Sequence, residues 1–405
     1  MPLPVGIDLV IPAYNEAAVL PSLYANLAAQ VDGEGRPLPR GSWRLALVDN
    51  ASTDGTAEVA ERLARDPAHP ETAVLLESEK GVVPARIRGS GFVLRPAERR
   101  RFPVVIHADA DNLFPPAFLH DAARRLEAGD VDVVTRLGHH PVDFWRRVPR
   151  VTRRHREEIG TIHFDEETLR ELEISEEGAL FTRRILADFG HVPHQCGLAM
   201  TKDAFARAGG YQREIWPDGT EMLGEARNLL YRLARSGARL AWVSEPPITL
   251  NSRRLLAEPQ KLWAGRSYTE GMSDIRDDLA DGAWSALDRL APDLEFRVMR
   301  RNLIQRFILD PCIARPDRLA PNRRYFGDAY EDIRQAIERL HASGCTGRYI
   351  DVRPLAETLL DRHQPAILDA LSQRAPYSRG RSAVRRLLLR IKPRCYHPNS
   401  QNRYS

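Results

Sequence analysis

Residues 104–112 read VVIHADADN and decide the fold. Three β-branched apolar residues open the stretch, as is typical of a strand covered on both faces. Two carboxylates, Asp109 and Asp111, follow where that strand ends. In α/β sheets ligands bind beyond the carboxyl ends of the strands, and paired oxygen ligands there suit Mg²⁺ or Mn²⁺ holding a diphosphate. The alternative is that one Asp caps the helix predicted from about residue 115 and the other is solvated.

Strand and helix patterns alternate on both sides of this stretch. Strands that alternate with helices of ten to fifteen residues are typical of βαβ units in a mostly parallel sheet with helices on both faces. The predicted strands cover residues 7–11, 45–48, 73–76, 104–106, 131–134, 197–201, 240–243 and 248–250. The predicted helices cover about 19–27, 57–64, 84–94, 115–127, 202–207 and 221–236.

Two further segments differ from this pattern. Residues 136–190 are rich in charge and predict a helical insertion, which is either a solvated surface or a lid or phosphate-binding region for the acceptor. Beyond residue 255 the strand signals fade and prolines interrupt helical patterns. We therefore expect an α/β domain over residues 1–255 and a helical extension over residues 256–405.

Charge is distributed unevenly along the 405 residues. The formal net charge is +4, yet nine Lys and Arg and no acidic residue follow position 373, so the body is mildly acidic. Within this tail, residues 384–391 form a basic amphipathic pattern that suits either an anionic membrane surface or docking on the preceding helices. We expect no nucleic-acid partner.

Several classes of protein are disfavoured by what the sequence lacks. Four scattered cysteines make no metal ribbon or disulfide framework, and no signal peptide or run of about 20 apolar residues occurs. The chain is therefore expected to be cytoplasmic, with peripheral membrane contact through the tail. His191, His194 and Cys196 lack a fourth metal ligand nearby, which favours packing. No phosphate-loop or dinucleotide fingerprint is present.

The polar turns after the first four strands form a series. They read IPAYNE, VDNASTDGT, KGVVPARIRG and ADADN, and residues 197–232 add GLAMTKDAFARAGGY…GEARNLLYRL. Over about residues 5–255 this series resembles glycosyltransferase family 2, of the GT-A fold. The resemblance implies inverting transfer from a nucleotide-diphosphate sugar, first a UDP-sugar, with GDP or dTDP as alternatives. It also implies Mn²⁺ or Mg²⁺ and a carbohydrate, lipid-linked or small-molecule acceptor.

The resemblance also implies roles for individual residues. Asp49 would accept a hydrogen bond from the base, Tyr14 would stack on it, and Asp109 would serve ribose, metal or both. Asp111 would bind the metal directly. Ile87 stands where the family usually has Asn after the Arg of its third turn. The implied nucleotide-sugar-binding residues are Pro12, Ala13, Tyr14, Glu16, Asp49, Arg86, Asp109, Arg253 and Arg254.

The catalytic base is the least typical part of the pattern. Inverting transfer needs a carboxylate that deprotonates the acceptor, and the family usually supplies the Asp of a Glu-Asp pair. Here Glu225 takes the position of the Glu, and Ala226 replaces the Asp. We predict Glu225 as the base, with Glu221 or Asp218 as alternatives. An impaired or non-catalytic nucleotide-sugar-binding protein is the second hypothesis, and a sugar nucleotidyltransferase, which lacks its Gly-rich loop here, is the third.

Overall fold

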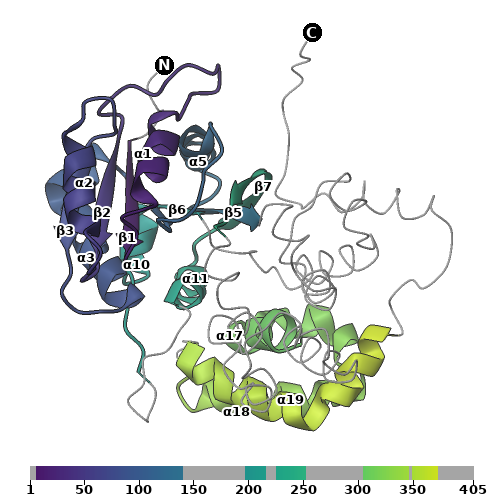
Figure 1. Cartoon of the computed structure of the whole chain (residues 1–405). Helices are drawn as coiled ribbons and strands as arrows, with labels where there is room; N and C mark the ends of the chain where they lie inside the picture. Colours follow the sequence, from purple (N-terminus) through teal and green to yellow (C-terminus); the bar gives the residue numbers. More distant parts are fainter. Residues whose placement is uncertain (1–5, 140–196, 216–224, 252–303, 346–348, 373–405) are drawn as a thin grey trace, which may run out of the picture.

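The computed structural model describes residues 6–139, 197–215, 225–251, 304–345 and 349–372. Within these residues the core of the fold is a seven-stranded sheet in the order β3-β2-β1-β4-β6-β5-β7 (Figure 1). Every neighbouring pair is parallel except those of β6, which runs antiparallel to β4 and β5. The strands are β1 (Ile7–Ala13), β2 (Trp43–Asp49), β3 (Thr72–Leu76), β4 (Val104–Ala108), β5 (Val133–His139), β6 (Gly197–Thr201) and β7 (Leu240–Thr249).

Helices cover both faces of this sheet, which confirms the predicted α/β class. Alternate residues of a strand point to opposite faces, so Ile7, Leu9 and Ile11 pack in one core while Val10 packs in the other. The first core includes residues of α1 (Leu20–Ala28), α2 (Thr56–Arg65) and α5 (Phe118–Glu127). The second includes residues of α3 (Val82–Val93), α10 (Lys202–Arg207) and α11 (Glu225–Arg235). A short helix, α4 (Pro96–Arg101), leads into β4.

The C-terminal helices form a core of their own beside α11 (Figure 1). They comprise a π-helix η1 (Ile304–Leu309), α17 (Asp310–Ala314), three 3-10 turns, α18 (Tyr330–Ala342) and α19 (Tyr349–Ser372). The 3-10 turns are η2 (Pro316–Arg318), η3 (Ala320–Tyr325) and η4 (Gly327–Ala329). No helix within the described residues is long and apolar enough to cross a membrane.

Two predicted boundaries need correction. The strands predicted at 240–243 and 248–250 are one strand, β7, whose pairing with β5 shifts register between Arg136 and Gly138. The charged insertion predicted from residue 136 does not begin there, because β5 continues to His139. Arg136 is buried in that strand, where it donates to Asp121 (2.7 Å) and to the carbonyl of Pro246 (2.6 Å). A cation with such partners is compatible with a buried strand. Residues 140–190 of the predicted insertion lie outside the described part.

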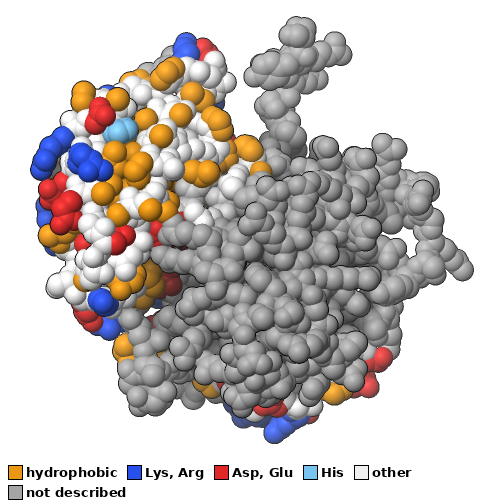
Figure 2. All heavy atoms as spheres, viewed as in Figure 1, with side chains coloured by type: hydrophobic (Ala, Val, Ile, Leu, Met, Phe, Trp, Pro, Cys, Tyr) orange, Lys and Arg blue, Asp and Glu red, His pale blue; other side chains and the backbone are white. Residues whose placement is uncertain are grey.

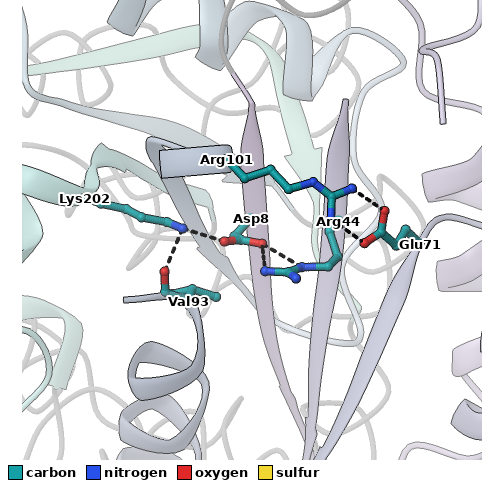
Figure 3. A network of polar contacts seen from close by, with 6 residues as sticks. All are labelled: Asp8, Arg44, Glu71, Val93, Arg101 and Lys202. Atoms are coloured by element: carbon teal, nitrogen blue, oxygen red, sulfur yellow. Dashed lines mark hydrogen bonds and ion pairs between the residues drawn. The ribbon is translucent and has the colours of Figure 1, made fainter. Parts of the chain in front are cut away.

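A buried ionic network closes the amino end of the sheet (Figure 3). Asp8 of β1 accepts from Arg44 of β2 at 2.8 and 3.0 Å and from the Lys202 ammonium at 2.5 Å. Because β6 is antiparallel to its neighbours, its last residues reach this end and place Lys202 beside Asp8. Lys202 also donates to the carbonyl of Val93 (2.7 Å), and both Asp8 and Lys202 are almost completely shielded from solvent. The network therefore ties β1, β2, α3 and the start of α10 together.

Charged side chains elsewhere lie mostly at the surface. On the face shown in Figure 2 they gather along the edge of the sheet domain that β3 and α2 form. Apolar side chains are scattered over the rest of the coloured face, which is ordinary for a folded domain.

Candidate functional site

The turns after β1 and β2 are joined by hydrogen bonds at the carboxyl end of the sheet. The amide of Asn15 donates to Ser52 Oγ (3.0 Å), that of Glu16 to Thr56 Oγ1 (2.8 Å), and that of Ala17 to Asp54 Oδ2 (3.1 Å). Asn15 Oδ1 in return accepts from the amide of Thr53 (2.9 Å). Backbone groups that would otherwise need water are thus satisfied between the two turns. The two turns therefore behave as one preorganised unit.

Two non-glycine residues of these turns have left-handed backbone conformations. Asn15 and Ala51 both have φ of 54°. Asn tolerates this region, whereas for Ala it costs about 1–2 kcal/mol. Strain of this kind persists where the surrounding contacts impose it, and Ala51 lies two residues after Asp49, within the network of turn hydrogen bonds.

Asp49 is the last residue of β2 and lies at the base of these turns. Its carboxylate is 5% exposed, and Oδ2 accepts a long hydrogen bond from the amide of Ser52 (3.4 Å). Oδ1 is buried and has no hydrogen-bond partner among the described residues. Leaving a buried acceptor unsatisfied costs about 1–3 kcal/mol, so such a group calls for an explanation. A ligand N–H donor at this position would satisfy it.

Asn50, to which the sequence reasoning gave no role, fixes the third turn to the second. Its Nδ2 donates to the carbonyl of Glu79 (2.5 Å), and its Oδ1 accepts from the amide of Gly81 (2.8 Å). Lys80 lies between these anchors, and its ammonium is 3.4 Å from the hydroxyl of Tyr14 and 5.4 Å from the ring centroid. Tyr14 is 41% exposed, so part of its ring is accessible to a ligand.

The other residues predicted in the first turn are less accessible. Pro12 is half-buried, while Ala13 and Glu16 are buried. The carbonyl of Ala13 accepts from the amide of Asn50 (2.8 Å). Ala13 therefore contributes to the site mainly through its backbone carbonyl, which joins the end of β1 to the turn after β2.

Arg86 connects the third turn to the end of β4, where Asp109 and Asp111 lie. Its guanidinium, on α3, donates to the carbonyl of Ala108 (2.8 Å) and to Asp109 Oδ1 (2.6 Å). Arg86 is buried, whereas the side chain of Asp109 is 52% exposed. A charge-assisted pair of this kind fixes the orientation of the carboxylate. The other oxygen of this half-exposed side chain has no hydrogen bond within the described residues, and Asp111, two positions on, is half-buried.

The charge of Glu225 also acts on the Arg86 guanidinium. Glu225 is the first residue of α11 and is half-buried. Burial lowers the pKa of Arg86, but Tyr211, Asp109 and Glu225 together raise it above its ordinary value. Burial raises the pKa of Tyr211, and the charges of Glu225 and Asp109 add to that effect. Two of the predicted carboxylates therefore act on one arginine, Asp109 through a direct hydrogen bond and Glu225 through its charge.

An aromatic cluster lies next to Arg86. The ring of Tyr211 lies 5.8 Å from the Arg86 guanidinium and meets His107 edge-on at 4.8 Å, and Phe205 packs against both rings. Neither ring nitrogen of His107 has a hydrogen-bond partner among the described residues. Burial, with Arg86 nearby, holds the pKa of His107 well below its ordinary value. Periodicity predicted His107 only as part of a strand, and no pattern in the sequence indicated the cluster.

The donor set at Asp109 and Asp111 suits a divalent cation held together with a diphosphate. Within the described part of the chain no group of three His, Cys, Asp or Glu forms a complete metal site. Mg²⁺ and similar ions are commonly held by one or two carboxylates plus substrate phosphates, which is the set available here. The site chemistry thus fits the predicted Mn²⁺ or Mg²⁺.

Other predicted site residues lie outside the described residues. They are Arg253, Arg254, the alternative bases Asp218 and Glu221, the group His191, His194 and Cys196, and the basic tail. Their roles stay predictions.

Comparison with known proteins agrees with the pattern of turns. Residues 8–190 match the family model described as Glycosyl transferase family 2. An undecaprenyl-phosphate 4-deoxy-4-formamido-L-arabinose transferase of Shewanella sediminis is 29% identical over 143 residues, which are 35% of this chain and 40% of that protein. The enzyme of the same name from Pectobacterium carotovorum is 35% identical over 111 residues, or 27% of this chain and 30% of that protein. The match thus spans well under half the length of these curated relatives.

A structural match extends over more of the chain at lower similarity. It is a mannosyltransferase, PcManGT, from Pyrobaculum calidifontis in complex with GDP-Man and Mn²⁺, with 15% identity and a TM-score of 0.45. The match covers 93% of this chain and 88% of that one. Over residues 8–190, a little under half of its length, the chain thus matches glycosyltransferase family 2.

Proposed function

We propose that the protein is a metal-dependent, inverting glycosyltransferase that moves a sugar from a nucleotide-diphosphate sugar to a hydroxyl acceptor. The observation that carries this proposal is the pairing of buried Arg86 with Asp109, together with the buried Asp49 oxygen that has no partner among the described residues. Glu225, at the start of α11, adds a carboxylate whose charge acts on the same Arg86.

The donor nucleotide would lie across the first three turns. Asp49 Oδ1 accepts a hydrogen bond from an N–H of the base, and the exposed ring of Tyr14 stacks on it. Uracil, thymine and guanine each carry such a ring N–H, so the donor classes are UDP-, dTDP- and GDP-sugars. We favour UDP because the resemblance to glycosyltransferase family 2 does.

The diphosphate would lie against Asp109 and Asp111 with a divalent cation. When bound, this ion neutralises the charge that develops on the leaving diphosphate. Arg86 holds Asp109 in place for it by occupying only one of the two carboxylate oxygens. Arg253 and Arg254 are proposed to contact the same phosphates.

Glu225 would take the proton of the acceptor hydroxyl. The acceptor oxygen attacks the anomeric carbon from the face opposite the diphosphate, the bond from that carbon to the diphosphate oxygen breaks, and the bonding pair leaves with the diphosphate. The position of Ala226 leaves Glu225 as the carboxylate at the start of α11.

A lipid-linked acceptor is the class we favour. The named curated relatives are undecaprenyl-phosphate transferases, and the basic tail beyond residue 373 suits an anionic membrane surface. Peripheral contact would bring the carboxyl end of the sheet to such a lipid without a spanning helix.

A donor panel tests the proposal. The chain is incubated with UDP-, GDP- and dTDP-sugars and Mn²⁺, with and without a polyprenyl-linked saccharide as the hydroxyl acceptor, and release of the nucleotide diphosphate is measured. Release from one donor class, abolished by EDTA and by Asp111→Ala, is expected. Full release by Asp111→Ala would exclude the metal assignment.

The second candidate is a nucleotide-sugar-binding protein without turnover, which Ala226 favours because the usual Asp is missing. Calorimetric binding of a nucleoside diphosphate, without release from any donor and with every acceptor tried, would support that candidate over the enzyme.

A further inference from the structure

Helix α11, which carries Glu225, is shared between two hydrophobic cores. Leu229, Leu230 and Leu233 pack in the core on the sheet. Tyr231 packs against the separate core of the C-terminal helices, and α11 contacts α19 directly (Figure 1). A helix held from both sides cannot move without disturbing one of the cores. The orientation of Glu225 therefore depends on the C-terminal helices as well as on the sheet.

A buried glutamate forms a polar connection at the same place. Glu214, on the segment that leads toward α11, is 5% exposed, and its Oε2 accepts from the amide of Ile350 at 3.3 Å. Ile350 is the second residue of α19, so its amide has no partner within that helix. An anion at the first turn of a helix is stabilising because of the helix dipole. Glu214 thus fixes where α19 begins relative to the sheet domain.

Glu214 also acts on α11 through Arg232. Burial lowers the pKa of Arg232, and the charge of Glu214 opposes that effect. Arg232 Nη1 donates to the carbonyls of Ala208 (2.7 Å) and Gly210 (2.5 Å). These carbonyls belong to a turn that needs glycine, since Gly209 and Gly210 have φ of 78° and 63°.

The Gly209-Gly210 turn places Tyr211 near Arg86. Tyr211 packs on His107 and faces Arg86, which in turn binds Asp109. A series of interactions therefore runs from the first turn of α19 through Glu214, Arg232 and the turn before Tyr211 to Arg86. Its links are the hydrogen bonds of Glu214 and Arg232, the charge interaction between these two residues, and the contact of the Tyr211 ring with Arg86.

We infer that Glu214 is a positioning residue through which the C-terminal helices hold the acceptor side of the site, α11 and its Glu225, in register with the donor side. This inference rests on the proposed function. The C-terminal helices are then a working part of the transferase and not an independent appendage.

Two substitutions separate the charge of Glu214 from its hydrogen bond. Glu214→Gln keeps an oxygen for the Ile350 amide but removes the charge that faces Arg232, and Glu214→Ala removes both. Glu331→Gln is the matched control, because Glu331 pairs with Arg334 entirely within the exposed face of α18. The readouts are the rate of nucleotide release from the active donor, the Kd for UDP or GDP with Mn²⁺, and hydrogen exchange over residues 349–360.

We expect the release rate to fall about three- to tenfold in Glu214→Gln and further in Glu214→Ala, as substitutions along coupled contacts do. The Kd for the nucleoside diphosphate should change less than the rate, within about twofold, because the hydrogen bonds that hold Asp49 and the first two turns involve neither Glu214 nor Arg232. Exchange at the start of α19 should quicken in Glu214→Ala, and Glu331→Gln should match the wild type in all three. A general loss of packing would weaken nucleotide binding as well, so this split identifies positioning.

Unchanged release together with unchanged exchange in both variants would overturn the inference, as would a loss of nucleotide affinity equal to the loss of rate. If Glu214→Ala fails to fold, Glu214→Gln decides alone. A wild-type chain that releases nucleotide from no donor would refute the proposed function, while the exchange measurement on α19 would still test the contact itself.

Discussion

The two ends of the central sheet use the same residue types in opposite ways. At the amino end, Asp8 is enclosed by Arg44 and Lys202, and every carboxylate oxygen has a cationic partner (Figure 3). At the carboxyl end, Asp49 keeps a buried oxygen without a partner, and Asp109 gives one oxygen to Arg86 and keeps the other without a hydrogen bond among the described residues. Charges at the first end are satisfied within the protein, and charges at the second await a ligand.

This difference indicates that the amino end of the sheet stabilises the fold and that the carboxyl end carries the candidate ligand site. A fully paired buried network contributes rigidity, because removing any member strands the others in a low-dielectric interior. Incompletely satisfied carboxylates and left-handed turn residues lower stability and are retained where a ligand completes them. The four predictions that follow each alter one residue of the sheet or of the segments next to its strands; all of them measure stability, and the two at the ligand-binding turns also measure nucleotide affinity.

The largest effect is expected at the amino end. Lys202→Met preserves much of the side-chain volume but leaves Asp8 with one cation instead of two, so the free energy of unfolding should fall by about 3–5 kcal/mol. Urea denaturation measures it. Arg239→Gln is the control, since Arg239 pairs with Asp132 at the surface and should cost about 0–1 kcal/mol. Equal losses in the two variants would mean that the network is not a principal stabilising feature.

At the carboxyl end the same kind of change should have the opposite pattern. Asp49→Asn is nearly isosteric, and it removes a buried charge whose Oδ1 lacks a partner. We expect unfolding free energy to stay constant or rise, while the Kd for UDP or GDP increases about 10- to 100-fold, the loss of a hydrogen bond to a charged acceptor. Calorimetry and urea denaturation on one preparation give both numbers. Lower stability with unchanged affinity would reverse the roles of the two ends.

Of the two ends of the sheet, only the carboxyl end could be predicted from the sequence. Apolar periodicity predicted the strands, and the ordered turns predicted which end carries Asp49, Asp109 and Arg86. Asp8 and Lys202 gave no signal, because they are 194 positions apart and meet only through the antiparallel direction of β6. Patterns local in sequence predict what parallel strand ends share, whereas contacts set by tertiary packing need the fold.

The same reason explains the other misses. The two strands predicted at 240–243 and 248–250 are joined because Glu245, Pro246 and Pro247 accompany a register shift in β7 instead of ending it. Asn50 was overlooked because its partners are backbone atoms of another turn. Tyr211 was overlooked as a neighbour of Arg86, since its contact with that residue depends on the Gly209-Gly210 turn and on α10.

A smaller effect is expected at His107, the second-last residue of β4. Burial holds its pKa below the value in the unfolded chain, so the unfolded state binds more protons and stability falls as pH drops below about 6.5. His107→Phe removes this proton uptake and two unpartnered ring nitrogens. The variant should be about 1 kcal/mol more stable at pH 5 and change less at pH 8. Denaturation at the two pH values measures this, and a parallel acid loss in variant and wild type would assign it to other groups.

The smallest effect concerns the strain at the carboxyl end. Ala51 has φ of 54°, a conformation that glycine adopts without penalty, but glycine also has more freedom in the unfolded chain to lose. The two terms nearly offset, so Ala51→Gly should raise unfolding free energy by only about 0.5 kcal/mol. Because the turn hydrogen bonds on both sides involve Asn15, Ser52 and Asp49, nucleotide affinity should weaken slightly through greater mobility of the turn. A gain in stability with tighter binding would show that the strain at Ala51 is unrelated to the ligand. A gain in stability with weaker binding would show that the turn is held in its ligand-binding conformation at the expense of stability, as the comparison of the two ends of the sheet requires.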